Sequence, residues 1–224
     1  MSESGSDGNA REERRAARRR SLALLATRVR SLIDASVNTD VEPAVVERVA
    51  DEVARLDAEL RERLHGGPYS GLLGGVAFDA ERPASRLPLS PFAGELNPIA
   101  PPLDLRYDGD RLVGSAVLGK AYIGPPGTAH GGVVAGLMDQ MVAAAGQRFE
   151  LGGVTARMTV EFRRPTPLGV PLELAGWLEP QDESQSRVRR VHAEIRAGGE
   201  VTVEAEALIV VRADFAANRG KEAG

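Results

Sequence analysis

The chain contains no cysteine among its 224 residues, which excludes disulfide bonds, thiolate metal ligands and a cysteine nucleophile. Histidine is scarce as well. The three histidines are scattered at positions 65, 130 and 192, so we expect no zinc site and no metal or redox cofactor. Lysine is almost missing, and arginine supplies nearly all of the 28 basic residues. The formal net charge of -4 gives no reason to expect nucleic acid as a partner.

The sequence also lacks a long apolar run near its start. The run at residues 22–27 is stopped by Arg28 and is short for the core of a signal peptide. We therefore expect a cytoplasmic protein without a membrane partner. Hydrophobic residues still make up 42% of the chain, which is ample for a core. The length fits one domain with an extension, or two small domains.

Composition divides the first hundred residues into three segments. Residues 1–20 are polar and arginine-rich and predict a disordered arm or a frayed helix. Residues 21–66 carry apolar residues at helical spacing in two stretches. They predict a two-helix extension that packs on the core domain or helps assembly. Residues 67–103 hold half of the 14 prolines and predict an ordered loop or linker.

From residue 104 onward the apolar pattern changes to a period of two. It predicts a folded domain over residues 104–213, followed by a disordered tail at 214–224. The Asp108–Gly109 pair predicts a hairpin turn, and short links elsewhere predict antiparallel pairing of neighbouring strands. The expected strands cover residues 103–107, 111–118, 154–162, 171–179, 187–196 and 201–212.

One long helix is expected inside this run of strands. Gly131 and Gly132 leave backbone N–H groups uncovered where the helix begins. Residues 133–147 are apolar on nearly every side, which predicts a core helix too short to span a bilayer. The result is an α+β domain in which the sheet wraps the helix. Asp139 is then expected to be a buried acid, which is costly unless it is paired or used.

These residues resemble the hotdog-fold acyl-CoA thioesterases of the phenylacetate-pathway (PaaI-like) group, from about residue 90 to 211. The resemblance rests on His130-Gly131-Gly132 followed by Asp139 nine residues after the histidine, on Thr155, and on the strand end at 162–168. It implies a hotdog fold, subunits paired edge to edge in a homodimer, and active sites at the interface. Many relatives carry an asparagine shortly before the His-Gly-Gly, which this chain lacks.

The resemblance and the chemistry of thioesters together suggest roles for several residues. The Gly131 N–H is a fixed donor for the negative charge that builds on a carbonyl under attack. Asp139 is the nucleophile or the general base, and its alternative is a structural acid bonded to a strand backbone. His130 contacts the substrate or fixes the loop, and Thr155 orients water or the carboxylate. Further candidates for substrate binding are Gly132, Gln140, Arg163 and Arg164. The two arginines contact the phosphates of coenzyme A or, as the alternative, are solvated surface side chains.

Gly131 and Asp139 are eight residues apart, which is about 12 Å along one helix. Reacting atoms must approach to about 3 Å. One helix therefore cannot supply both groups to one carbonyl. We expect a dimer in which Gly131 of one chain faces Asp139 of the other, and whether two dimers then form a tetramer stays open.

The same residues leave two functions other than hydrolysis open. A non-catalytic module that binds acyl thioesters or serves assembly is the main alternative, and an enoyl-CoA hydratase is a weaker one. Residues 114–121 approach a phosphate-binding loop, but Ala121 replaces the hydroxyl that such loops need. No Gly-x-Ser-x-Gly motif occurs, which argues against a serine hydrolase.

Overall fold

The computed structural model describes residues 3–67, 83, 88–148, 153–180 and 188–211. The chain divides into two units, residues 1–77 and 78–224. The boundary lies inside the segment that composition marked as a linker, so the last part of that segment belongs to the second unit. The predicted tail at 214–224 lies outside the described residues.

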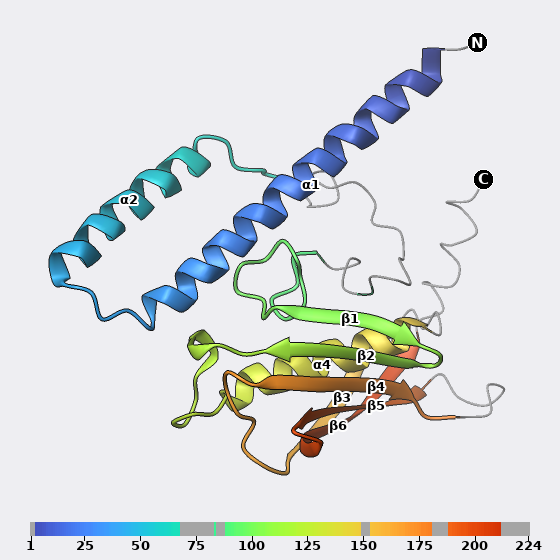
Figure 1. Ribbon diagram of the computed structural model, residues 1–224. Coiled ribbons are helices and arrows are strands. Elements are labelled where there is room, and N and C mark those ends of the chain that lie inside the picture. Colours follow the sequence, from blue (N-terminus) through green and yellow to red (C-terminus); the bar gives the residue numbers. More distant parts are fainter. Residues whose placement is uncertain (1–2, 68–82, 84–87, 149–152, 181–187, 212–224) are drawn as a thin grey trace. The chain divides into compact units, whose positions relative to one another are not determined.

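The first unit contains two helices, α1 (Glu3–Ser36) and α2 (Pro43–Arg61), which confirms the helical extension (Figure 1). Residues 3–20 are helical where we expected disorder or a frayed helix. Arginine, alanine and glutamate favour helix, which accounts for residues 10–20 of α1, whereas its first residues are rich in serine and glycine and have no such propensity. Proline in the first turn of α2 fits its start. No residue of α2 is buried.

None of the helices in the described part of the chain is long and apolar enough to cross a membrane.

The second unit is built on a six-stranded antiparallel sheet in the order β1-β2-β4-β5-β6-β3. The predicted strands are confirmed to within two residues at each end, and a left-handed glycine, Gly109 (φ 57°), closes the first hairpin. Gly198 and Gly199 (φ 58° and 82°) turn the chain between the last two strands. The strands are β1 (Leu103–Asp108), β2 (Arg111–Val117), β3 (Gly153–Phe162), β4 (Pro171–Leu178), β5 (Val188–Ala197) and β6 (Glu200–Val211).

One pairing differs from the expectation. β3 and β4 follow each other closely in the sequence but do not pair. β3 pairs with β6 instead, and β4 lies between β2 and β5. After β2 the chain forms the long helix and then β3, at the far edge of the sheet. It returns to the middle of the sheet with β4. β3 is therefore an edge strand, with no neighbour on its other side among the described residues.

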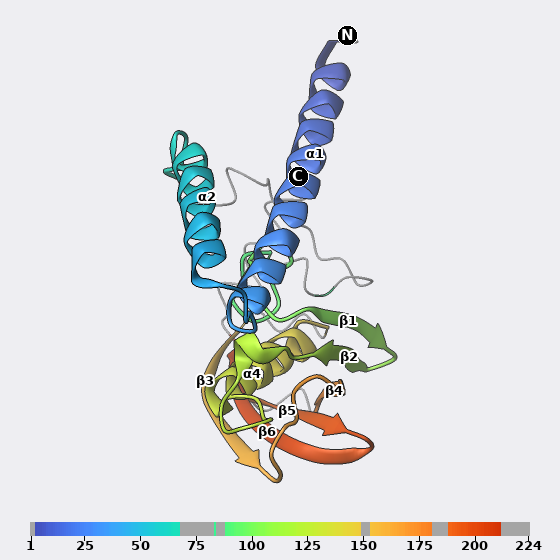
Figure 2. The same cartoon turned by 60° about the vertical axis from the view of Figure 1, so that its left-hand side comes forward.

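Helix α4 (Gly131–Arg148) lies on the concave side of the sheet (Figure 2), which confirms the hotdog arrangement. Its large apolar side chains face the strands and are fully buried, and each contributes about 1.5–3 kcal/mol to folding. They are Val134, Leu137, Met138, Met141 and Val142.

The opposite face of α4 is open to solvent at Gly132 and Asp139. The prediction of a buried acid is therefore wrong for the single chain. Glycine and alanine count as apolar in a sequence pattern, but they are too small to cover a neighbouring carboxylate.

Candidate active site

The loop that leads into α4 is held in place from several sides. A short 3-10 helix, η2 (Lys120–Tyr122), precedes it. The His130 N–H donates to the Tyr122 carbonyl at 2.9 Å, and the Ala129 N–H donates to the Thr166 carbonyl at 2.8 Å. Gly127 sits in the left-handed region (φ 76°) and accepts a bond from the Leu168 N–H at 3.0 Å. The start of α4 is thus fixed both to η2 and to the loop after β3.

His130 caps this helix start. Its Nδ1 accepts a hydrogen bond from the Gly132 N–H at 3.0 Å, and its carbonyl accepts from Val133 and Val134 at 2.9 and 3.1 Å. Since Nδ1 accepts, the proton of the neutral ring sits on Nε2. The hydrogen bond from the Gly132 N–H supports the loop-fixing role for His130.

The backbone N–H of Gly131 differs from that of Gly132. No acceptor for it occurs in the part of the chain that the structure describes. It sits at the positive end of the α4 dipole, where a free N–H favours negative charge. A Cβ placed on Gly131 would lie 3.6 Å from the ring of Phe162, so an aromatic side chain that is 56% exposed stands beside this donor.

Asp139 is on the same helix, two turns further along. Its side chain is exposed, and within the described ranges it makes neither a hydrogen bond nor an ion pair. The alternative of a structural acid bonded to a strand backbone therefore has no such bond in its favour. Eight residues of helix still separate Asp139 from Gly131, about 12 Å, so the single chain does not bring the two groups together.

Thr155 lies far from Gly131 in one chain. It is exposed and pairs with Ile209 near the start of β3, where the register shifts. Phe162, next to Gly131, ends the same 10-residue strand. Seven residues of extended chain span about 23 Å, so Thr155 and the Gly131 N–H stand near opposite ends of β3.

Two of the predicted substrate contacts are already engaged within the chain. The N–H of Gly132 donates to His130. Gln140 is only 9% exposed, and its Oε1 accepts a hydrogen bond from Ser90 Oγ at 2.7 Å. Ser90 lies in the segment predicted to be an ordered loop or linker, and no sequence motif includes it.

Arg163 and Arg164 extend from the end of β3 into solvent. Arg163 Nε donates to Glu204 Oε2 at 2.8 Å, and Arg163 also pairs with Glu161. The hydrogen bond to Glu204 and the charge of Glu161 raise the pKa of Arg163. Arg164 Nη1 donates to Glu200 Oε2 at 2.7 Å. A phosphate reaching either arginine must compete with these exposed carboxylates.

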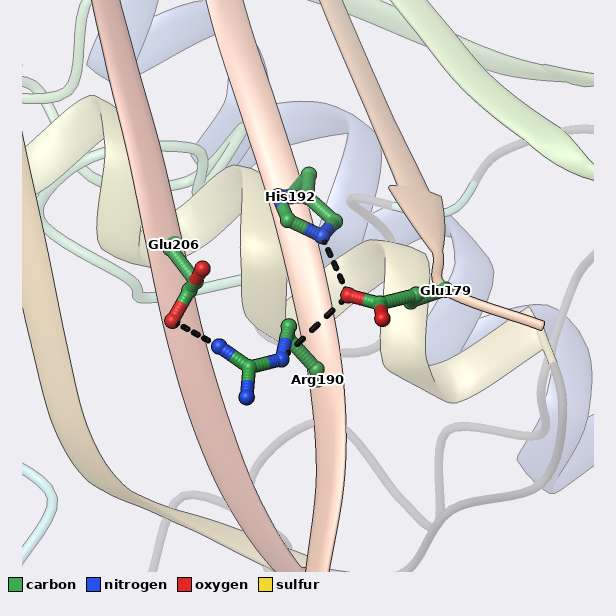
Figure 3. A network of polar contacts seen from close by, with 4 residues as sticks. All are labelled: Glu179, Arg190, His192 and Glu206. Carbon is green, nitrogen blue, oxygen red and sulfur yellow. Dashed lines mark hydrogen bonds and ion pairs between the residues drawn. The ribbon is translucent and has the colours of Figure 1, made fainter. Parts of the chain in front are cut away.

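His192 belongs to a different surface (Figure 3). Val191 and Ala193 are buried against the core, so His192 points to the outer face of the sheet. Its Nε2 lies 2.9 Å from Glu179 Oε2, and Arg190 pairs with both Glu179 and Glu206. The His192 ring also stacks on Trp177, with 5.6 Å between ring centroids.

A shallow hollow of about 440 Å³ lies beside this cluster. Its lining includes two rings, those of Trp177 and His192, and three acids, Glu161, Glu204 and Glu206. Each of these acids pairs with an arginine: Glu161 and Glu204 with Arg163, and Glu206 with Arg190. In the described ranges of the chain, no group of three or more His, Cys, Asp or Glu side chains is arranged to hold a metal ion.

Comparison with known proteins places these observations in a family context. The family model described as "Thioesterase superfamily" matches residues 126–189, a span that includes every predicted site residue. The crystal structure of protein RHA08564, a thioesterase superfamily protein, is 31% identical, with a TM-score of 0.70. The match covers 84% of this chain and 90% of that one, so it must extend well before β1.

Two further solved structures match over about half of the chain. A phenylacetic acid degradation-related protein from Ralstonia eutropha JMP134 is 23% identical, with a TM-score of 0.43, covering 49% of this chain and 84% of that one. The PaaI protein of E. coli is 19% identical, with a TM-score of 0.44, covering 48% and 82%. No curated protein matches the sequence.

Proposed function

The chain belongs to the thioesterase superfamily, and from that premise we propose that it hydrolyses an acyl-CoA thioester to a free acid and coenzyme A, as a PaaI-like enzyme. One observation carries the proposal. The start of α4 presents a backbone N–H, that of Gly131, without an acceptor among the described residues, while the carboxylate of Asp139 on the same helix is exposed and unpaired there.

Gly131 supplies the electrostatic part of the reaction. When the thioester carbonyl is attacked, its oxygen gains negative charge, and a rigid N–H at a helix start stabilises that charge without rearranging. Loss of one such donor typically slows an enzyme by about 10²–10³-fold. His130 supports this role because it occupies the Gly132 N–H and fixes the loop.

Asp139 supplies the attack, by one of two routes. As a general base it takes a proton from water, the hydroxide adds to the carbonyl carbon, and the C–S bond breaks to release the thiolate of coenzyme A. As a nucleophile it displaces the thiolate itself and forms a mixed anhydride, which water then hydrolyses. Thr155 assists by orienting the water or the carboxylate.

The two groups reach one carbonyl if two chains share the site. β3 is a 10-residue edge strand with exposed apolar side chains at both ends, Val154 and Phe162, and such an edge favours pairing with another strand. Antiparallel pairing of β3 with its copy about a two-fold axis brings the Thr155 end of one chain beside the Phe162 end of the other. Gly131 stands next to Phe162, so this pairing brings Thr155 of one chain toward Gly131 of the other. We propose that it also brings the partner's Asp139 to the shared carbonyl, in a homodimer that is alone or part of a tetramer.

The test is thiol release from a panel of acyl-CoAs by the wild type, Asp139→Asn and a matched control, Asp104→Asn. Asp104 is an exposed acid on β1, at the other edge of the sheet. We expect Asp139→Asn to abolish turnover with folding and assembly intact, and Asp104→Asn to match the wild type. Tight binding of acyl-CoA without turnover in the wild type would instead indicate a non-catalytic binding module.

A further inference from the structure

Part of the proline-rich segment before β1 is an ordered loop. Within residues 88–100, here the 88–100 loop, the Leu96 N–H donates to the Pro88 carbonyl at 2.9 Å and the Gly94 N–H donates to the Ser90 carbonyl at 3.0 Å. The Asn97 side chain donates to the Leu89 carbonyl at 3.0 Å. The loop therefore keeps its shape through its own hydrogen bonds.

The ring of Phe92 lies directly against α4 at Gly136. A Cβ placed on Gly136 would come within 2.2 to 2.7 Å of three ring atoms of Phe92. Only a residue without a side chain leaves room for the ring at this position. The pair therefore forms a fitted contact between the 88–100 loop and the helix.

A second contact fixes the loop one helical turn further along. Ser90 Oγ donates to Gln140 Oε1 at 2.7 Å, and Gln140 is buried. Positions 136 and 140 are neighbours on one helix face. The 88–100 loop is thus fixed to two adjacent turns of α4, by the packing of the Phe92 ring on its seat at Gly136 and by the hydrogen bond between Ser90 and Gln140.

The seat is next to the proposed catalytic acid. Gly136 precedes Asp139 by three residues, which makes the two positions neighbours on the surface of α4. Phe92 is only half-buried and Asp139 is exposed, so both lie at the side of the helix that faces away from the strands. An acyl group whose carbonyl is held at Asp139 meets this ring when it extends along α4.

From this geometry we infer that Phe92 is a specificity-determining residue, whose ring limits the length of the acyl chain that the site accepts. The inference rests on the proposed function. Phe92 does not take part in the reaction; it occupies space that a longer chain needs. The expected substrates are short-chain acyl-CoAs, and removing the ring opens the site to longer ones.

The experiment compares kcat/KM for acyl-CoAs from acetyl to dodecanoyl in the wild type, Phe92→Ala and Phe92→Leu. The control is Ile99→Ala, which shortens another apolar side chain of the same loop, one that is 56% exposed. We expect the decanoyl-to-butanoyl ratio of kcat/KM to rise at least about tenfold in Phe92→Ala, the equivalent of burying about two more methylenes. Phe92→Leu shifts the ratio in the same direction and covers the case in which the alanine variant does not fold.

Gly136→Ala tests the seat without relying on activity. Its methyl group collides with the Phe92 ring, so we expect a lower Tm in the wild-type background and no such loss in the Phe92→Ala background, where the ring is absent. An equal loss of Tm in both backgrounds would show that the Phe92 ring does not pack on Gly136.

The outcomes separate the two proposals. If the wild type hydrolyses acyl-CoAs but the chain-length profiles of both Phe92 variants run parallel to it, the inference about Phe92 is wrong and the proposed function stands. If the wild type hydrolyses no acyl-CoA, both are wrong.

Discussion

The imidazole of His130 accepts a hydrogen bond from the backbone N–H of Gly132 at 3.0 Å. This bond makes the two adjacent glycines, Gly131 and Gly132, differ in whether their backbone N–H groups are occupied. One N–H is occupied by the histidine ring, and the other, that of Gly131, has no acceptor in the described part of the chain. Three of the predictions below depend on this difference between the two glycines.

The first prediction concerns the cap. Replacing His130 by alanine removes the acceptor for the Gly132 N–H and is expected to lower the free energy of unfolding by about 1 kcal/mol, the usual cost of a lost N-cap. Asparagine is among the best capping residues, so His130→Asn should recover most of that loss. Chemical denaturation of both variants measures the difference. Equal destabilisation by alanine and asparagine would show that the ring does more than cap the helix.

The second prediction isolates the Gly131 N–H. Proline is well tolerated in the first helical position, where its missing N–H breaks no helical bond. Gly131→Pro therefore removes the proposed donor and little else, and kcat is expected to fall about 10²–10³-fold. Gly131→Ala is the matched control, because it keeps the N–H and its Cβ makes an ordinary 3.6 Å contact with Phe162. Similar rates for the two variants would remove Gly131 from the mechanism.

A third prediction tests whether two chains share each site. Dimers of Asp139→Asn alone and of Gly131→Pro alone should both be inactive. A mixed dimer has one intact site, formed by Asp139 of the Gly131→Pro chain and Gly131 of the Asp139→Asn chain. After refolding an equal mixture, about a quarter of the wild-type activity should return, since half of the dimers are mixed and each has one of two sites. Mixtures that stay inactive, although they form mixed dimers, would contradict a shared site.

The fourth prediction addresses the edge strand. Val154 on β3 is 51% exposed, and Val117 on the interior strand β2 is 47% exposed. Val154→Asp places a charge on the proposed pairing edge. It should shift the protein toward monomers and lower its activity per chain. Val117→Asp adds the same charge away from this edge and should leave the molecular mass of the assembly unchanged. Analytical ultracentrifugation at several concentrations, together with the thiol-release assay, checks both variants.

Much of the second unit could be predicted because its signals are local. Alternation along residues 111–118 and 201–212, and the Asp108–Gly109 turn, each specify a strand or a hairpin without knowledge of the rest of the chain. The long apolar helix was recognisable for the same reason. The position of β3 was not, because it depends on the path of α4 across the sheet and not on the length of the link to β4.

The sequence indicated candidate site residues but not their surroundings in the folded chain. Asp139 is surrounded mostly by apolar residues in the sequence. The smallest of them, glycine and alanine, do not cover its carboxylate, and the acid is exposed. Gln140 turned out to bind Ser90, a partner 50 positions away that no spacing rule connects to it. Phe92 has no sequence signature either, since only the seat at Gly136 gives it a place beside α4.

The position of β3 at the rim of the sheet has a consequence for how this protein can change. In the proposed homodimer, a side chain near the two-fold axis that relates paired copies of this strand meets its own counterpart. A substitution there would be introduced twice in one contact and would alter both proposed sites together. Variation in the middle of β3 would then act on the assembly as a whole, whereas variation in the 88–100 loop would adjust the accepted substrate and leave the pairing of the chains intact.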